Sequence, residues 1–223
     1  VGAALPAHAA NPVGQDGIMV ILLDEGASPV QRDLDAAETV ALTMARDTTA
    51  GTVASASYGV ESNEIVTAES GPAGVRLVDD VITSVRGMDI GPARSDQFTA
   101  LADAFAFLSR VDAAEGSRVA FVTAGRILGE SENTRERLIS VADLFAAEGW
   151  VIDVATLPST EPVLRELMSG LAAGSNGFFY DTGTAAGIAT LFENYSQLTL
   201  ANSMNAEMHD NSAAIVNLDI APH

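Results

Sequence analysis

The sequence has no cysteine and no lysine, and all 11 of its basic residues are arginine. The absence of cysteine excludes thiol nucleophiles, disulfide frameworks and iron–sulfur sites. The absence of lysine excludes Schiff-base chemistry and Walker-type phosphate loops. Only three histidines are present, and His8, His209 and His223 all lie in the terminal segments, away from any predicted strand. A Ser-His-Asp triad therefore lacks its base, and we expect no catalytic residues and no enzyme activity.

Acidic residues outnumber basic ones by a wide margin. The 223 residues include 30 aspartates and glutamates against 11 arginines, which gives a formal charge of −19. Such a field repels nucleic-acid phosphates and anionic lipid surfaces, so we expect no nucleic-acid partner. No apolar run reaches the length of about 18 residues that a membrane span needs, and we expect no membrane span in this sequence. The 48% hydrophobic content and the mean hydropathy of +0.22 predict a folded globular chain.

The two ends of the sequence differ in composition from the part between them. Residues 1–15 are rich in alanine and contain Ala7-His8-Ala9, a small-x-small pattern typical of signal-peptide cleavage. We therefore interpret 1–15 as a signal-peptide remnant or a disordered N-terminal segment. We expect an exported protein, which is periplasmic, on the cell surface or secreted. Residues 201–223 are first polar and then alternate like a strand, which predicts a linker and the start of an additional β domain C-terminal to His223.

Residues 16–200 alternate between two hydrophobic periods, one typical of strands and one typical of helices. Strands are predicted at Ile18–Leu23, Thr52–Val60, Ile65–Thr67, Arg118–Thr123, Val151–Leu157 and Gly177–Tyr180. Helices are predicted at Val30–Arg46, Val75–Val85, Phe98–Arg110, Arg135–Glu148, Glu161–Ala172 and Ala185–Leu200. Strands that alternate with long helices form right-handed crossovers, and the second and third strands form a plausible hairpin. The predicted fold is α/β: a doubly wound, mostly parallel, Rossmann-like sheet with one antiparallel edge strand and helices on both faces.

In such a sheet, ligands bind beyond the carboxyl ends of the strands, at the loops that we call the top face. The first strand ends in Asp24-Glu25-Gly26-Ala27-Ser28, where a carboxylate and a hydroxyl four positions apart open the turn into a helix. Hard oxygen ligands of this kind bind Mg²⁺ or Mn²⁺. A simpler interpretation is that Asp24 and Ser28 cap the following helix and satisfy backbone donors. Asp33, on the predicted helix, is interpreted as a solvated or first-turn acid that complements the helix dipole.

The order of these segments resembles the von Willebrand factor type A (VWA) family, whose first strand ends in Asp-x-Ser-x-Ser. The segment GIMVILLDEGAS looks like the first strand and metal loop of that family. ARSDQFTALADAF looks like its Thr-containing loop and the helix that follows, and RVAFVTAGR like its fourth strand and Thr-Asp-Gly turn. GWVIDVATL is similar to the fifth strand, and LRELMSGLAAGSNGFFYDTG to the Gly turn and aromatic strand. The resemblance implies that residues 16–200 are a VWA-like domain with a metal-ion-dependent adhesion site.

Matched position by position, that site is degenerate. Asp24 stands at the first Asp of the family, Ser28 at its second Ser and Ser95 at its Thr, so these three are the tentative metal ligands. Gly26 replaces the first Ser and Ala124 replaces the second Asp, which removes one direct ligand and one of two carboxylates. Because metal affinity depends on the number and charge of the ligands, we expect no cofactor, or at most weakly bound Mg²⁺.

The resemblance implies a non-catalytic adhesion, protein-binding or assembly module whose partner is another protein, docked at the top-face loops. The expected partner-binding residues are Asp24, Glu25, Ser28, Ser95 and Asp96, and Glu25 could also swing in as a substitute carboxylate for the metal. Two other functions stay open. One is a hydrolase or phosphoryl-transfer enzyme that uses Asp24 on a doubly wound sheet, and the other is a purely structural spacer domain.

Overall fold

The computed structural model describes residues 16–27, 29–88, 95–124 and 132–196. The predicted signal-peptide or disordered segment (1–15) and the predicted linker and β-domain start (201–223) lie outside these ranges, as does Ser28. None of the described helices is long and apolar enough to cross a membrane. The described ranges include every strand that the sequence pattern predicts.

A six-stranded sheet forms the centre of the domain, in the order β3-β2-β1-β4-β5-β6. The strands are β1 (Ile18–Asp24), β2 (Thr52–Tyr58), β3 (Val66–Glu69), β4 (Arg118–Thr123), β5 (Val151–Thr156) and β6 (Phe179–Asp181). All neighbouring pairs are parallel except β2 and β3, which pair antiparallel at one edge. The predicted doubly wound, mostly parallel sheet with one antiparallel edge strand is confirmed.

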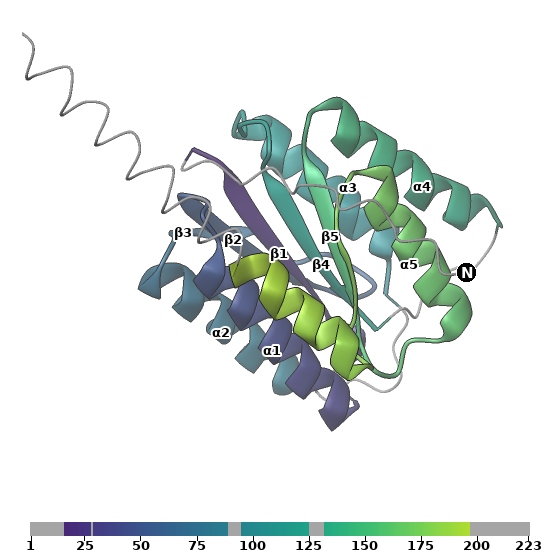
Figure 1. Ribbon diagram of the computed structural model, residues 1–223. Coiled ribbons are helices and arrows are strands. Elements are labelled where there is room, and N and C mark those ends of the chain that lie inside the picture. The colour runs from purple at the N-terminus through teal and green to yellow at the C-terminus, as the bar shows by residue number, and fades with distance from the viewer. Residues whose placement is uncertain (1–15, 28, 89–94, 125–131, 197–223) are drawn as a thin grey trace, which may run out of the picture.

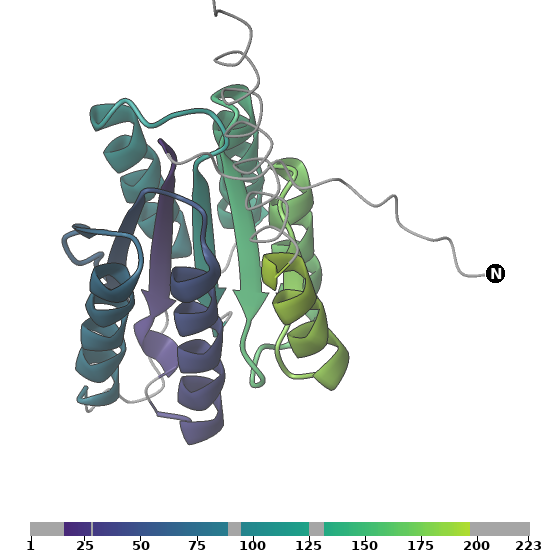
Figure 2. The same ribbon diagram turned by 60° about the vertical axis from the view of Figure 1, so that its left-hand side comes forward.

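Helices cover both faces of this sheet. They are α1 (Gln31–Asp47), α2 (Pro72–Arg86), α3 (Gln97–Arg110), α4 (Glu132–Ala147) and α5 (Pro162–Gly174), and residues 185–196 form a further helix. α1, α2 and the helix of residues 185–196 lie on one side of the sheet, and α3, α4 and α5 lie on the other (Figure 1 and Figure 2). This three-layer arrangement buries both faces of the sheet.

Side chains of β1 alternate between two hydrophobic cores. Met19, Ile21 and Leu23 pack with α1 and α2 in one core, whereas Val20 and Leu22 pack with α3 and α4 in the other. All five residues are at most 2% exposed. Because a central parallel strand is covered on both faces, its sequence is a continuous apolar run rather than an alternating pattern.

Where both ends can be compared, the helices and strands differ from the prediction by at most about three residues. The predicted end of the last helix, Leu200, lies outside the described residues. α2 begins at Pro72 rather than Val75, because proline suits the first helical position, where its missing N–H is not needed. Gly71 precedes it with a φ of 80°, a conformation that favours glycine. A short 3₁₀ turn, η1 (Glu25–Ala27), follows β1, and the apolar pattern does not predict it. It starts the connection from β1 to α1.

A buried ion pair joins β4 to β5. Arg118 donates to Asp153 from Nε at 2.8 Å and from a terminal nitrogen at 2.7 Å, and both side chains are at most 1% exposed. Burial alone would lower the pKa of Arg118, but the Asp153 carboxylate more than offsets this and raises it. Asp153 also accepts hydrogen bonds from the Tyr195 hydroxyl at 3.1 Å and from the Phe178 backbone N–H at 2.8 Å. Through its bond with Tyr195, Asp153 therefore ties the helix of residues 185–196 to the sheet. The sequence pattern predicts the two strands but not this contact.

Candidate functional site

Asp24, the last residue of β1, lies at the centre of a buried hydrogen-bond network on the top face, and it is 2% exposed. Its Oδ1 accepts from the Gly26 N–H at 2.7 Å and from the Ser95 hydroxyl. Its Oδ2 accepts from the Ala124 N–H at 2.8 Å and from the Thr123 hydroxyl at 3.1 Å. β1 and β4 are neighbours in the sheet, so their carboxyl ends bring Asp24 and Thr123 together (Figure 1). A carboxylate has about four lone-pair sites, and here a donor of the chain occupies each of them.

Ser95 and Gln97 bring the start of α3 into the same network, and both are fully buried. Gln97 donates from Nε2 to the Thr123 hydroxyl oxygen at 3.1 Å, and its Oε1 has no hydrogen-bond partner among the described residues. Asp96 lies between the two, but its carboxylate caps α3. It accepts from the Thr99 N–H at 3.0 Å and from the Thr99 hydroxyl at 2.8 Å. This cap fixes the backbone at the start of α3, and so helps to position the neighbouring Ser95, whose hydroxyl donates to Asp24.

Glu25 is bonded to the neighbouring strand and its loop rather than to the Asp24 network. Its Oε1 accepts from the Ser57 hydroxyl at 2.9 Å and from the Asn63 side-chain amide at 2.7 Å. These bonds hold the loop after β2 against the turn after β1. Both bonds engage Oε1, so they would compete with any role of that oxygen as a substitute metal ligand beside Asp24.

Burial raises the pKa of Asp24 above its ordinary value, and the four hydrogen bonds, of which that from Ser95 has the largest effect, offset part of the rise. Tyr58, at the end of β2, donates from its hydroxyl to the Val122 carbonyl at 3.2 Å. Burial first, and the charge of Asp24 second, raise the pKa of Tyr58 well above its ordinary value, so this phenol stays neutral. The site is thus a buried acid surrounded by neutral donors, and the described ranges contain no histidine to serve as its base.

The structure brings two of the predicted site residues, Asp24 and Ser95, into direct contact. Glu25 and Asp96 belong to the same loops but bond to Ser57, Asn63 and Thr99 instead. Ser28 lies outside the described residues.

Thr123 and Gln97 complete the network, although neither stands at a predicted ligand position. The signal for Thr123 is its place at the end of β4, beside the end of β1, where a hydroxyl reaches the same edge of the sheet. No such signal exists for Gln97, because the helical pattern gives no reason for a buried amide on the first turn of α3. Its role depends on how closely α3 approaches β4.

Asp33 is a first-turn acid of α1, as predicted, but it is fully buried rather than solvated. Its carboxylate accepts from the Ser159 N–H at 3.0 Å and from the Ser159 hydroxyl. Ser159 follows β5, so this contact links the start of α1 to another top-face loop. The partners are 126 residues apart in sequence, and the local helical pattern therefore carries no sign of the contact.

Two positions that the resemblance assigns to metal ligands carry no side-chain oxygen in this chain. Gly26 and Ala124 contribute backbone N–H groups, and both donate to Asp24. In the described part of the chain, no group of three or more histidine, cysteine, aspartate or glutamate side chains is placed to hold a metal ion. An unpartnered acceptor does border the network, and it is the neutral Oε1 of Gln97.

The fold is similar to that of several solved structures. The manganese-loaded TRAP protein of Plasmodium vivax matches with a TM-score of 0.58 at 16% identity, over 80% of this chain and 74% of that chain. The N-terminal domain of TFIIH p34 matches with a TM-score of 0.55 at 14% identity, over 81% of this chain and 98% of that chain. Human Sec24c, a COPII-coat protein, matches with a TM-score of 0.51 at 9% identity, over 84% of this chain and 33% of that chain. The fold is VWA-like.

No protein-family model matches the sequence, and no curated protein matches it at a significant level. At identities of 9% to 16%, the structural likeness establishes the shared VWA-like fold alone. The predicted fold class is therefore confirmed. The metal, the partner and the location of the protein stay predictions.

Proposed function

We propose that this chain is a non-catalytic binding or assembly module of an exported protein, and that another protein docks on its top face without a strongly bound metal ion. The observation that carries the proposal is the state of Asp24. Its carboxylate stands at a ligand position of the VWA family, yet four donors of the chain itself engage it. An acid used in this way organises the loops around it instead of presenting its charge to a ligand.

The chemistry of the top-face donors supports weak or absent Mg²⁺ binding. Mg²⁺ requires near-octahedral oxygen coordination and gives up its water reluctantly. Asp24 would have to lose at least one hydrogen bond to ligate it, and the N–H groups of Gly26 and Ala124 repel a cation. The Oε1 of Gln97 is a free acceptor, but one neutral oxygen does not replace the second carboxylate of a metal site.

Without a metal, contact with a partner would rest on shape, apolar area and hydrogen bonds. Val60, in the loop after β2, is 60% exposed and offers apolar area. It lies at the top face, because the carbonyl of its neighbour Gly59 accepts from the Asp96 N–H at 2.7 Å. A protein that covers the Asp24 network would also bury this side chain.

The names of two structural neighbours favour an assembly role. One is a domain of TFIIH p34 and the other is a coat protein of COPII. The third neighbour, TRAP, was solved in a manganese-loaded form. The VWA-like fold therefore occurs both in a metal-loaded protein and in proteins named as parts of larger assemblies. The four hydrogen-bond donors around Asp24 favour an assembly role for this chain.

Photo-crosslinking from the top face tests the docking proposal. A photoreactive residue would replace Val60 in one variant and Val111 in a control, and both would be used to capture partners from extracts of the source cells. Val111 is 43% exposed and caps the end of α3 away from Asp96, so it presents similar apolar area far from the top face. We expect one protein to crosslink from position 60 and not from position 111. Equal crosslinking from both, or none from position 60, would instead favour a purely structural spacer.

A panel of phosphatase and esterase substrates tests the non-catalytic part of the proposal. We expect no turnover, because Asp24 is buried and its oxygens already accept four hydrogen bonds. Turnover that disappears in Asp24→Asn would assign catalysis to this carboxylate and overturn the proposal.

Export is a separate part of the proposal, and it rests on the Ala7-His8-Ala9 pattern. The test is to express the complete gene in its source cells, fractionate them and determine the N-terminus of the mature protein. We expect cleavage just before Ala10 and recovery in an exported fraction. An uncleaved cytosolic product would contradict export while leaving the docking proposal intact.

A further inference from the structure

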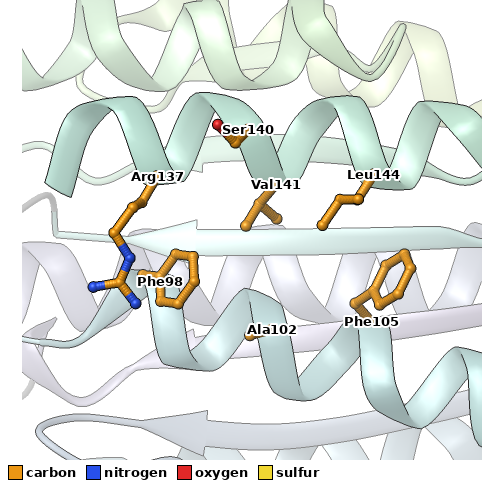
Figure 3. A pocket seen from close by; sticks show the side chains of 7 residues that line it. All are labelled: Phe98, Ala102, Phe105, Arg137, Ser140, Val141 and Leu144. Carbon is orange, nitrogen blue, oxygen red and sulfur yellow. The ribbon is translucent and has the colours of Figure 1, made fainter. Parts of the chain in front are cut away.

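An apolar groove of about 320 Å³ runs between α3 and α4 on the outer surface of one helix layer. It is lined by Phe98, Ala102 and Phe105 of α3 and by Arg137, Ser140, Val141 and Leu144 of α4. Phe98 and Phe105 point from α3 toward α4, and Arg137, Val141 and Leu144 point from α4 toward α3 (Figure 3). Leu144 is 52% exposed, so the groove leaves apolar area open to solvent. An exposed apolar groove of this kind marks a binding surface more often than an isolated apolar residue does.

Among the described residues that line the groove, Arg137 is the one that is charged, and it lies at one end. Its guanidinium carbon is 3.7 Å from the centroid of the Phe98 ring. Stacking engages the face of a guanidinium, whereas its N–H donors point outward in its plane. Within the described ranges Arg137 forms no ion pair. Its edge is therefore available to a carboxylate, which a guanidinium binds through two parallel hydrogen bonds.

The other end of the groove is apolar and held in place from behind. Phe105 packs edge-on against Phe145 and Trp150, with ring centroids 5.4 Å and 5.3 Å away. From Phe98 to Phe105, and from Arg137 to Leu144, the lining covers two turns of each helix, roughly 10 Å at about 1.5 Å per residue. A ligand that fills the groove thus meets a cation at one end and an apolar floor over about 10 Å.

We propose that this groove binds a short segment of a partner protein that carries apolar side chains and one carboxylate. The apolar side chains fill the space between Phe105 and Leu144, and the carboxylate pairs with Arg137. The groove lies between α3 and α4, and its Phe98 end adjoins Gln97 of the Asp24 network. It is a second docking surface, and it does not depend on the function proposed for the top face.

The charges around the groove restrict the occupant further. Asp103 on α3, and Glu136 and Asp143 on α4, are exposed acids on the helices that form the groove. These acids repel a segment that carries many negative charges. The segment that fits is therefore neutral apart from the one carboxylate that pairs with Arg137. A second copy of the chain is a poor occupant, because two molecules of charge −19 repel each other. The occupant is therefore held by apolar contacts and by a single ion pair.

Selection from a library of random peptides tests the proposal. The library would be displayed on phage, panned on the wild-type protein and counter-selected on Ala102→Glu, which fills the groove and adds a negative charge. We expect peptides with two or three apolar residues and one Asp or Glu. Synthetic versions would then be titrated by fluorescence anisotropy, together with versions that carry Asn or Gln in place of the acid.

Two matched pairs of variants separate the groove from general effects. Arg137→Gln removes the groove cation, whereas Arg110→Gln removes a cation that lies 5.7 Å from the centroid of another ring, that of Phe107. Ala102→Glu blocks the groove, whereas Ala106→Glu adds the same charge at an exposed position of the same helix. We expect Arg137→Gln and the removal of the peptide acid each to weaken binding roughly tenfold, as loss of a charged hydrogen-bond pair does. The two control variants should bind like wild type, and thermal melting should show that all four fold.

Several outcomes would overturn the proposal. One is a failure to enrich any peptide that prefers wild type over Ala102→Glu, and another is the enrichment of basic or acid-free peptides. Equal binding by wild type and Arg137→Gln would remove the role of the guanidinium. Two further measurements address other occupants. Groove-dependent binding of decanoate with no selected peptide would identify a small amphipathic acid as the ligand, and self-association of wild type that Ala102→Glu abolishes, seen by sedimentation, would identify a second copy of the chain.

Discussion

Replacing Asp24 with asparagine probes the hydrogen-bond network on which the proposed function depends. The carboxylate accepts two backbone N–H groups, from Gly26 and Ala124, and two hydroxyls, from Ser95 and Thr123. Each oxygen takes one backbone donor and one hydroxyl. Asparagine keeps the size of the side chain and one acceptor oxygen, but it places an NH₂ group where the other oxygen was.

The cost of this change follows from which donors can adapt. A serine or threonine hydroxyl can rotate and accept from the new NH₂ group, whereas a backbone N–H cannot. In either orientation of the amide, one buried N–H, from Gly26 or Ala124, is left without a partner, which costs about 1–3 kcal/mol. Loss of the charge returns part of the desolvation cost that raises the pKa of Asp24. We therefore expect the free energy of unfolding at pH 7 to fall by about 2 kcal/mol.

Urea unfolding followed by circular dichroism measures this difference. Asp79→Asn is a suitable control, because Asp79 is an exposed residue of α2, and its substitution should change the free energy of unfolding by less than about 0.5 kcal/mol. An Asp24→Asn protein as stable as wild type, with an unchanged denaturant slope, would refute the reasoning. It would mean that the four donors do not depend on a carboxylate, and the argument that Asp24 is unavailable to a ligand would fail with it.

Three further predictions concern the same network and the buried ion pair. Burial raises the pKa of Asp24 in the folded state above its ordinary value of about 3.9, so the folded state binds the carboxyl proton more tightly than the unfolded state does. The contribution of Asp24 to stability therefore falls as the pH rises above its ordinary pKa. The stability difference between wild type and Asp24→Asn should therefore shrink as the pH rises above about 4, and a growing difference would show the opposite shift. Asp153→Asn leaves Arg118 buried without its counter-charge and should lower the free energy of unfolding by about 3–5 kcal/mol in the same urea assay. A loss below about 1 kcal/mol would indicate that the pair is hydrated. Calorimetry should detect little heat when Mg²⁺ is added to wild type but clear binding after Gly26→Ser with Ala124→Asp, and a folded double variant that behaves like its parent would show that the match to the VWA metal site is wrong.

Local patterns in the sequence predict most of the secondary structure, because strand and helix periods depend on neighbours in the chain. The run Ile18–Leu23 is apolar at every position, which indicates burial on both faces of a parallel sheet, and the structure confirms it. The same reasoning does not detect the ion pair of Arg118 and Asp153. Both residues stand in predicted strands, and nothing local shows that the two side chains meet inside the protein.

Long-range contacts explain why the site is predicted only in part. The resemblance to VWA domains places Asp24 and Ser95 at one site, and the structure joins them although 71 residues separate them. The hydroxyl of Thr123 is 99 residues from Asp24, and Asp33 is 126 residues from Ser159. Such contacts depend on the order of the strands and on the approach of α3 to the sheet. The hydrophobic period of a segment reports only its local secondary structure, so it predicts neither of these.

The sequence by itself determines what chemistry this protein lacks. A sequence without lysine or cysteine offers no thiol and no lysine amine as a nucleophile, whatever its fold. It also determines the α/β class, through the alternation of apolar strands and amphipathic helices. Only the tertiary structure decides the state of Asp24, because its four donors come from the turn after β1, the start of α3 and the end of β4. Packing brings these segments together around a buried carboxylate, and its lone pairs are then occupied by the protein itself.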